Sequence, residues 1–164
     1  MSKKATLNHL ANLGKPVVIA AVTDQASCDR LIRAGSMIAR EMGVGLKVVS
    51  VQPFNHNGFS LGLNLDYLYQ VAKDYDAEMS VFYHDDPLLM LGAFINRNHT
   101  VALVAGTTAG GYEGGFILDL RRSFPELTVH LVDPENAVYE LAPLAYSRGR
   151  KRAMKVRRLG EENT

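Results

Sequence analysis

The residues best suited to hold a ligand form a glycine-rich segment between an apolar run and a helix-like run. The segment reads VALVAGTTAGGYEGG from Val101 to Gly115 and contains five glycines. Backbone without a Cβ atom can approach a ligand closely, and the amide groups that open a helix favour an anion. A tight turn with close helix–sheet packing would need the same glycines and is the alternative explanation. The candidate binding residues of this segment are Gly106, Thr107, Thr108, Gly110 and Gly111.

This segment follows neither of the two common phosphate-binding patterns. A P-loop needs Lys followed by Ser or Thr after its glycines, whereas Gly110 is followed by Gly111. A dinucleotide fingerprint needs spaced glycines after the first strand, where the sequence is VTDQAS. The segment also contains Glu113 and no basic residue before Arg121. Backbone amides would therefore have to do most of the binding of any phosphate.

Asp24 is a second candidate binding residue, because it lies in the loop Thr23-Asp24-Gln25 after the first apolar run. A carboxylate in this position either caps the amides of the next helix or accepts hydrogen bonds from a ligand such as a ribose or an adenine. The sequence alone is compatible with both roles.

No catalytic or metal-binding set can be assembled from the sequence. His84, Asp85 and Asp86 are adjacent, but neighbouring residues point apart, and a solvated loop with a helix cap explains them better. The single cysteine, Cys28, excludes an internal disulfide and any zinc site with several cysteines. We therefore expect a binding protein and not an enzyme, with no catalytic residues and no metal site.

Alternating apolar runs and helix-period segments must position these residues. The runs are rich in Val and mostly continuous, as is typical of strands covered on both faces. Segments of helical period lie between them, at 29–42, around 64–75, from Pro87 after the cap residue Asp86, and from Gly115 to before Pro125. This order predicts a parallel sheet with helices on both faces and a ligand crevice at the carboxyl ends of the strands. The predicted strands are Val17 to Val22, Leu46 to Val51, Met79 to Tyr83, Val101 to Ala105 and Leu127 to Val132.

Composition and charge indicate a single globular domain with a basic C-terminal run. The chain has 164 residues, of which 47% are apolar, and no stretch reaches the ~20 apolar residues that span a bilayer. The N-terminal segment has no apolar run of signal-peptide length, so we expect a cytoplasmic protein. Residues 1–147 contain 11 basic and 15 acidic side chains, whereas residues 148–164 contain 7 and 2. Charges of −4 and +5 therefore lie in different parts of the chain.

Over roughly residues 15 to 133 the chain resembles the universal stress protein superfamily. The likeness rests on three stretches: VVIAAVTDQASCDRLIRAGSMIAREMGVGLKVVSVQP, HDDPLLMLGAFINRNHTVALVAGTT and FPELTVHLVDP. It is greatest to the stress-protein-like segment of bacterial potassium-sensing histidine kinases. The resemblance implies a three-layer, Rossmann-like α/β fold with an open sheet of five parallel strands in the order 3-2-1-4-5. It divides the chain into an N-terminal extension at 1–14, the α/β domain at 15–134 and a C-terminal extension at 135–164.

The resemblance also implies a nucleotide site. In nucleotide-binding members an Asp after the first strand contacts adenosine and the backbone ending the second strand faces adenine, which by position are Asp24 and Val51. Their phosphate loop has the form G-x-x-G, nine residues, then G-Ser/Thr. Gly106 matches its first glycine, but Gly110 comes one residue late and the closing pair is replaced by Phe116 and Ile117. The implied cofactor is ATP or AMP with magnesium, or none.

Three kinds of partner follow from the sequence. The resemblance implies a homodimer, paired through the last predicted strand, Leu127 to Val132, if that strand is an exposed edge. The seven basic residues within 148–158 could contact nucleic acid or an anionic membrane surface. We therefore predict a small stress-response or regulatory protein that binds an adenine nucleotide between the first and fourth strands. The alternative is a nucleotide-free signalling or interaction module that acts through dimerisation, a protein partner and the basic arm.

Overall fold

Strands and helices alternate along the chain as the apolar pattern predicts. The computed structural model describes residues 14–54, 62–107, 114–146 and 155–160. Within them no helix is long and apolar enough to cross a membrane. The elements are β1 (Val17–Ala21), the short 3-10 helix η1 (Ala26–Cys28), α2 (Asp29–Met42), β2 (Gly45–Gln52), α3 (Leu63–Asp74), β3 (Glu78–Tyr83), α4 (Pro87–Arg97), β4 (Thr100–Gly106), α5 (Gly115–Ser123), β5 (Thr128–Val132), β6 (Ala137–Leu141), the 3-10 helix η2 (Leu144–Tyr146) and β7 (Lys155–Arg158).

The described strands form one sheet in the order β3-β2-β1-β4-β5-β6-β7. Strands β1 to β5 are parallel, and their order confirms the predicted 3-2-1-4-5 core. The predicted count of five strands was wrong, because β6 and β7 extend the sheet by antiparallel pairing beyond β5. Both additional strands come from residues that the sequence placed in a C-terminal extension.

A tight turn between β5 and β6 explains why the chain returns to the sheet. The buried Asp133 accepts hydrogen bonds through Oδ1 from the main-chain N–H groups of Glu135 and Ala137, both at 2.9 Å. Asn136 takes a left-handed conformation with φ of 65°, which Asn tolerates better than most residues. Asp133 and Pro134 therefore begin a hairpin between β5 and β6.

β6 also changes what is available for dimerisation. The strand β5 pairs with β4 on one side and with β6 on the other, for example through Leu131 and Tyr139. Its backbone groups are used within the chain, so the predicted pairing of two copies through Leu127 to Val132 is not possible in this structure. In the described sheet the edge on this side is β7.

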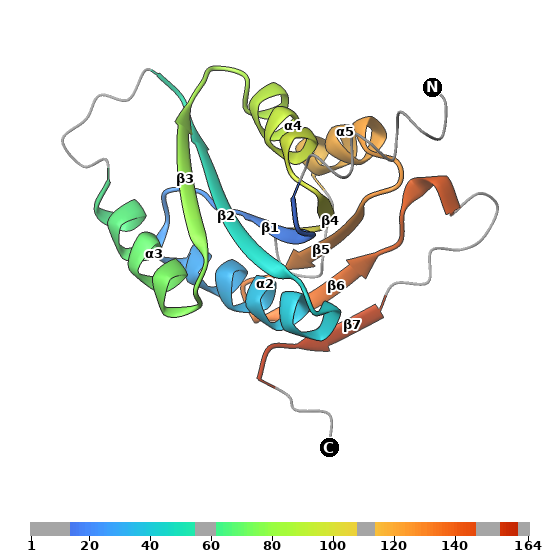
Figure 1. Ribbon diagram of the computed structural model, residues 1–164, viewed down its shortest axis with the longest axis horizontal. Helices are drawn as coiled ribbons and strands as arrows, with labels where there is room; N and C mark the ends of the chain where they lie inside the picture. The colour runs from blue at the N-terminus through green and yellow to red at the C-terminus, as the bar shows by residue number, and fades with distance from the viewer. Residues whose placement is uncertain (1–13, 55–61, 108–113, 147–154, 161–164) are drawn as a thin grey trace.

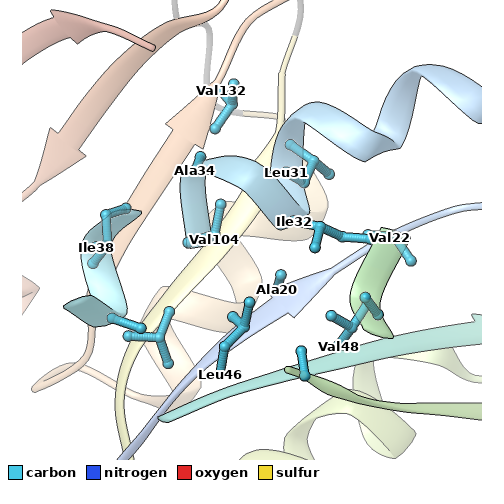
Figure 2. Close-up of a cluster of buried hydrophobic side chains, with 14 of the residues drawn as sticks. Ala20, Val22, Leu31, Ile32, Ala34, Ile38, Leu46, Val48, Val104 and Val132 are labelled. Atoms are coloured by element: carbon cyan, nitrogen blue, oxygen red, sulfur yellow. The ribbon is translucent and has the colours of Figure 1, made fainter. Parts of the chain in front are cut away.

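Helices α2 and α3 cover one face of the sheet, and α4 and α5 cover the other (Figure 1). Each face has its own apolar core. On the α2 side, Leu31, Ile32 and Ile38 project from the helix onto the sheet, where Ala20 and Val104 are also fully buried (Figure 2). The polar face of α2 is left to solvent, which accounts for its helical periodicity in the sequence.

Local signals set the ends of two helices as predicted. Asp86 caps α4 by accepting a hydrogen bond from the N–H of Leu89 at 3.0 Å, and Pro87 occupies the first helical position. Gly43 ends α2 in the left-handed conformation, with φ of 69°. Asp86 and Pro87 therefore fix the start of α4, and Gly43 fixes the end of α2.

Candidate ligand-binding site

A cavity of about 620 Å³ opens at the carboxyl ends of β1, β2 and β4. It lies at the switch point of the sheet, where the chain passes from β3 on one side of β1 to β4 on the other. Open α/β sheets bind their ligands at this point, and the volume falls within the roughly 300–1,000 Å³ of small-molecule sites. Its described walls are Ala21, Val22, Thr23, Val49, Val51, Pro87, Leu91, Ala105, Gly106, Thr107, Gly114, Phe116 and Ile117.

The walls of this cavity, which we call the switch-point cavity, are mainly apolar. Val49, Leu91 and Ile117 belong to the apolar core on the α4 and α5 side of the sheet. The described lining residues include no charged side chain, and their side-chain polar groups are the hydroxyls of Thr23 and Thr107. Such walls suit a flat, largely apolar ligand body that a few hydrogen bonds orient.

The first turn of α5 forms one end of the switch-point cavity. Gly114 is the N-cap residue and offers no side chain to the free amides, and Gly114, Phe116 and Ile117 all line the cavity. The first intrahelical bond runs from the N–H of Leu118 to the carbonyl of Gly114 at 3.1 Å. Main-chain N–H groups before Leu118 have no intrahelical acceptor, and the helix dipole gives this end a partial positive charge. An anionic part of a ligand would be favoured here.

The structure brings together three of the residues that the sequence selected. Val51, Gly106 and Thr107 line the switch-point cavity from the ends of β2 and β4. The main-chain N–H of Thr107 continues the sheet by donating to the carbonyl of Val132 at 3.1 Å. Thr108, Gly110 and Gly111 lie outside the described residues. The ligand-binding role of all these residues stays a prediction.

Asp24 is placed differently from the other candidates. It does not line the switch-point cavity, although its neighbour Thr23 does. Its carboxylate caps neither η1 nor α2, whose N-cap positions are Gln25 and Cys28. Its carbonyl accepts a hydrogen bond from Nδ2 of Asn64 at 3.2 Å, and its buried Oδ1 has no partner among the described residues. An unsatisfied buried oxygen of this kind costs about 1–3 kcal/mol unless a donor reaches it.

Arg30 is a residue near the site that sequence reasoning missed. Its Nη2 atom lies 3.3 Å from the position that a Cβ atom on Gly106 would occupy. A cation therefore stands beside the start of the glycine segment, which contains none before Arg121. The signal was present in the topology: in a parallel sheet the first turn of α2 lies at the same edge as the end of β4.

The polar residues around His84 are used locally. Nδ1 of His84 accepts a hydrogen bond from the N–H of Asp86 at 2.9 Å, and Oδ1 of Asp85 accepts one from the N–H of Phe54 at 3.3 Å. Searching the described residues finds no group of three or more His, Cys, Asp or Glu side chains that could hold a metal ion. These bonds explain the His-Asp-Asp sequence as a loop and a helix cap.

Groups with shifted pKa values lie away from the switch-point cavity. Burial lowers the pKa of His130, which projects from β5 toward α2. The pKa of Tyr67 is raised, mainly because its hydroxyl donates to the Asp29 carboxylate at 2.8 Å. The pKa of Tyr139 is raised by burial and by its bond to Asp133. These shifts do not mark an acid or base in the cavity.

Comparison with solved structures identifies the fold. A universal stress protein from Archaeoglobus fulgidus superposes with a TM-score of 0.51 at 17% sequence identity, over 77% of this chain and 98% of that protein. The fold is that of the universal stress proteins. A universal stress protein from Archaeoglobus fulgidus in complex with dAMP superposes with a TM-score of 0.46 at 15% identity, over 74% of this chain and 98% of that protein. No protein-family model and no curated protein matches the sequence.

Proposed function

We propose that this chain is a regulatory protein that binds an adenine nucleotide in the switch-point cavity and acts through binding, without catalysing a reaction. The observation that carries the proposal is a cavity of about 620 Å³ at the switch point, with apolar walls and the first turn of a helix at one end. A purine ring suits the apolar walls, and an anionic group suits the amides of α5. A stress-response role, as the fold suggests, belongs to the same proposal.

The proposal assigns a part of the nucleotide to each side of the cavity. The purine would lie between the ends of β1 and β2 and the side chain of Leu91, with the backbone at Val51 facing its edge. Asp24 would accept a hydrogen bond from a ribose hydroxyl, which would satisfy its unpartnered Oδ1. The walls offer no charged acid or base among the described residues, which supports binding over catalysis. AMP and ATP with magnesium are both tested, since they carry the same adenine and differ only in the number of phosphates.

Thermal unfolding with millimolar ATP, ADP or AMP, each with magnesium, tests the proposal. A ligand at ~100 times its dissociation constant stabilises the native state by about 2.7 kcal/mol, which raises the unfolding midpoint by roughly 5–10 °C at this size. We expect such a shift with at least one of the three and none with a pyrimidine nucleotide. An equal midpoint in every solution would rule out a nucleotide site of useful affinity.

A matched pair of variants connects the shift to the cavity. Ala21 lies in the wall at the end of β1, and Ala21→Phe would fill part of the space without removing a hydrogen bond. Ala93 is exposed on α4 and is not part of the wall, so Ala93→Phe adds the same ring elsewhere. Nucleotide protection should disappear in the first variant and persist in the second. Equal protection in both would place the ligand outside the switch-point cavity.

The second candidate function is a nucleotide-free interaction module. Two observations favour it: the described residues of the cavity wall include no cation, and β7, with its exposed residues Val156 and Arg158, is an edge strand of the described sheet. The partner would then contact β7 and the basic residues 148–158. This partner would be a second copy of the chain, another protein, nucleic acid or an anionic membrane. Sedimentation over a concentration series, together with vesicle and nucleic-acid binding at two salt concentrations, distinguishes these partners. Binding with the same affinity at both salt concentrations would exclude the basic residues as the contact surface.

A further inference from the structure

A second and more polar pocket lies at the same edge of the sheet, on the α2 side. Its volume is about 350 Å³. The described residues that line it come from the start of η1, the first turns of α2 and the turn between β5 and β6. Those with polar side chains are Gln25, Ser27, Asp29, Arg30, Arg33 and Asn136. We call this the Arg30 pocket.

Arg30 has hydrogen-bonding capacity that the described protein does not use. Its Nη1 donates to the carbonyl of Ser27 at 2.7 Å. Its Nε is shielded from solvent and has no partner, and the guanidinium forms no ion pair with any described residue. A guanidinium presents five donors in a fixed fork that matches the oxygens of a phosphate or a carboxylate. Arg30 therefore has a positive charge and hydrogen-bond donors that an anionic ligand could use.

The charge of the pocket favours an anion even though Asp29 is present. Asp29 already has partners within the protein: its Oδ2 accepts a hydrogen bond from the hydroxyl of Tyr67 at 2.8 Å, and its Oδ1 pairs with Nη2 of Arg33 at 3.7 Å. Two arginines and one aspartate leave one net positive charge among the lining residues. The amides of Gln25 and Asn136 and the hydroxyl of Ser27 add neutral donors.

The Arg30 pocket adjoins the switch-point cavity through two short connections. Gly106 lines the cavity, and Nη2 of Arg30 lies 3.3 Å from the position of a Cβ atom on Gly106. Along the chain, Thr23 lines the cavity and Gln25 lines the pocket, with Asp24 between them. One ligand could therefore place its apolar body in the cavity and extend past Asp24 to an anionic group at Arg30.

We propose that the Arg30 pocket is an anion subsite that binds a phosphate group, with Arg30 as the residue that selects phosphorylated over unphosphorylated ligands. Its assignment to a nucleotide rests on the proposed function, whereas the phosphate subsite itself does not. Arg30 supplies the positive charge that the glycine segment lacks. The absence of a side chain at Gly106 leaves room for the guanidinium beside the end of β4.

Titration of the full-length protein with inorganic phosphate tests the subsite without a nucleotide. The probes are the Nε–H resonance of Arg30 and, in every variant, the main-chain amide resonances of the lining residues Ser27 and Asn136 in ¹⁵N NMR spectra. We expect a saturable shift of these resonances in the unmodified protein and no saturable binding of phosphate in Arg30→Gln. Arg122→Gln is the matched control, because Arg122 is exposed on α5 and lies near Asp119 only. Phosphate that binds equally well to Arg30→Gln would overturn the proposal.

A comparison of AMP with adenosine separates this proposal from the proposed function. We expect Arg30→Gln to weaken AMP binding by about tenfold or more and to leave adenosine binding unchanged, with Arg30→Lys intermediate because it keeps the charge without the fork. AMP and adenosine that bind the unmodified protein equally, or AMP that binds more tightly by a margin that Arg30→Gln does not change, would overturn the subsite while the cavity proposal stands; the second result would place the phosphate at the amides of α5. Phosphate binding that depends on Arg30, with no binding of AMP or adenosine, would support the subsite and overturn the nucleotide site. Unchanged unfolding midpoints of the variants without ligand exclude misfolding as the cause.

Discussion

Glu41, in the last turn of α2, and Arg157, in β7, form an ion pair in which Nη1 lies 2.6 Å from Oε1. The two residues are far apart in the sequence, and the bond connects the C-terminal strand to the helix beside the apolar core. Part of the basic run is therefore built into the sheet. Arg157, which the sequence placed in a basic arm for external partners, has an internal partner here.

We expect this ion pair to contribute little to stability. The side chains of Arg157 and Glu41 are 37% and 51% exposed, so water and salt screen their attraction. A double-mutant cycle with Arg157→Gln and Glu41→Gln, measured by urea unfolding, should give a coupling energy of about 0.2–1 kcal/mol. The coupling should shrink further in 1 M salt. A value that is larger and insensitive to salt would show that β7 is held more firmly than this exposure implies.

Gly35 is needed where α2 crosses the sheet. A Cβ atom there would lie 2.8 Å from Cδ1 of the buried Leu46 and 3.4 Å from Cβ of Ala20. Gly35→Ala should therefore lower the free energy of unfolding by about 1–2 kcal/mol, even though Ala favours a helix by about 1 kcal/mol.

Gly92 provides the matched control for this prediction. It lies in α4, and a Cβ atom there would meet the ring of Phe124 at an ordinary contact distance of 3.5 Å. Gly92→Ala should raise the free energy of unfolding by about 0.5–1 kcal/mol. Urea unfolding of both variants checks the pair, and a stabilising Gly35→Ala would show that Leu46 moves aside at no cost.

Asp133 should be the most important polar residue of the hairpin between β5 and β6. It accepts hydrogen bonds from the N–H groups of Glu135 and Ala137, each at 2.9 Å, and from the hydroxyl of Tyr139 at 3.1 Å. Asp133→Ala leaves two main-chain donors without this acceptor and should destabilise the protein by about 2–4 kcal/mol. Tyr139→Phe removes one bond and should cost about 1 kcal/mol. Chemical unfolding of the two variants tests the ranking, which equal losses would refute.

His130 should make the protein less stable in mild acid. Its side chain is 4% exposed. Burial, the largest effect, lowers its pKa below 6.5, and Arg157 lowers it further, whereas Glu140 and Glu41 raise it. Because the folded-state pKa is lower than the unfolded-state pKa, the unfolded chain binds more protons between the two values. The stability contribution of neutral His130 is therefore complete above about pH 6.5 and is lost as the pH falls from there toward the folded-state pKa.

Unfolding free energies measured between pH 7.5 and pH 5.5 test this effect. We expect His130 to contribute a slope of at most about 1.4 kcal/mol per pH unit, so the slope should be smaller in His130→Gln than in the unmodified protein. His99→Gln serves as the control, because His99 is a half-buried residue that directly precedes β4. A slope that survives in His130→Gln and disappears in His99→Gln would assign the acid sensitivity to the wrong histidine.

The sequence by itself determined the five parallel strands, and its resemblance to the universal stress proteins implied their order. The end of the sheet at which a ligand would bind stays a prediction. Continuous apolar runs such as VVIAA mark strands that are buried in the sheet, and caps such as Asp86 with Pro87 mark the start of a helix. Both signals depend only on residues that are neighbours in the sequence. The same local patterns placed Val51, Gly106 and Thr107 at strand ends, where they meet in one cavity.

Only the tertiary structure decided which distant residues meet. The pairing of β6 and β7 depends on a turn at Asp133 and on partners elsewhere in the sheet, because short strands carry little signal of their own. Asp24 lies outside the cavity wall although it is only three residues beyond the end of β1. Arg30 stands beside Gly106, and Arg157 beside Glu41, through contacts between side chains of separate elements. Periodicity reports how each element is buried, whereas the packing of elements against one another sets these long-range contacts.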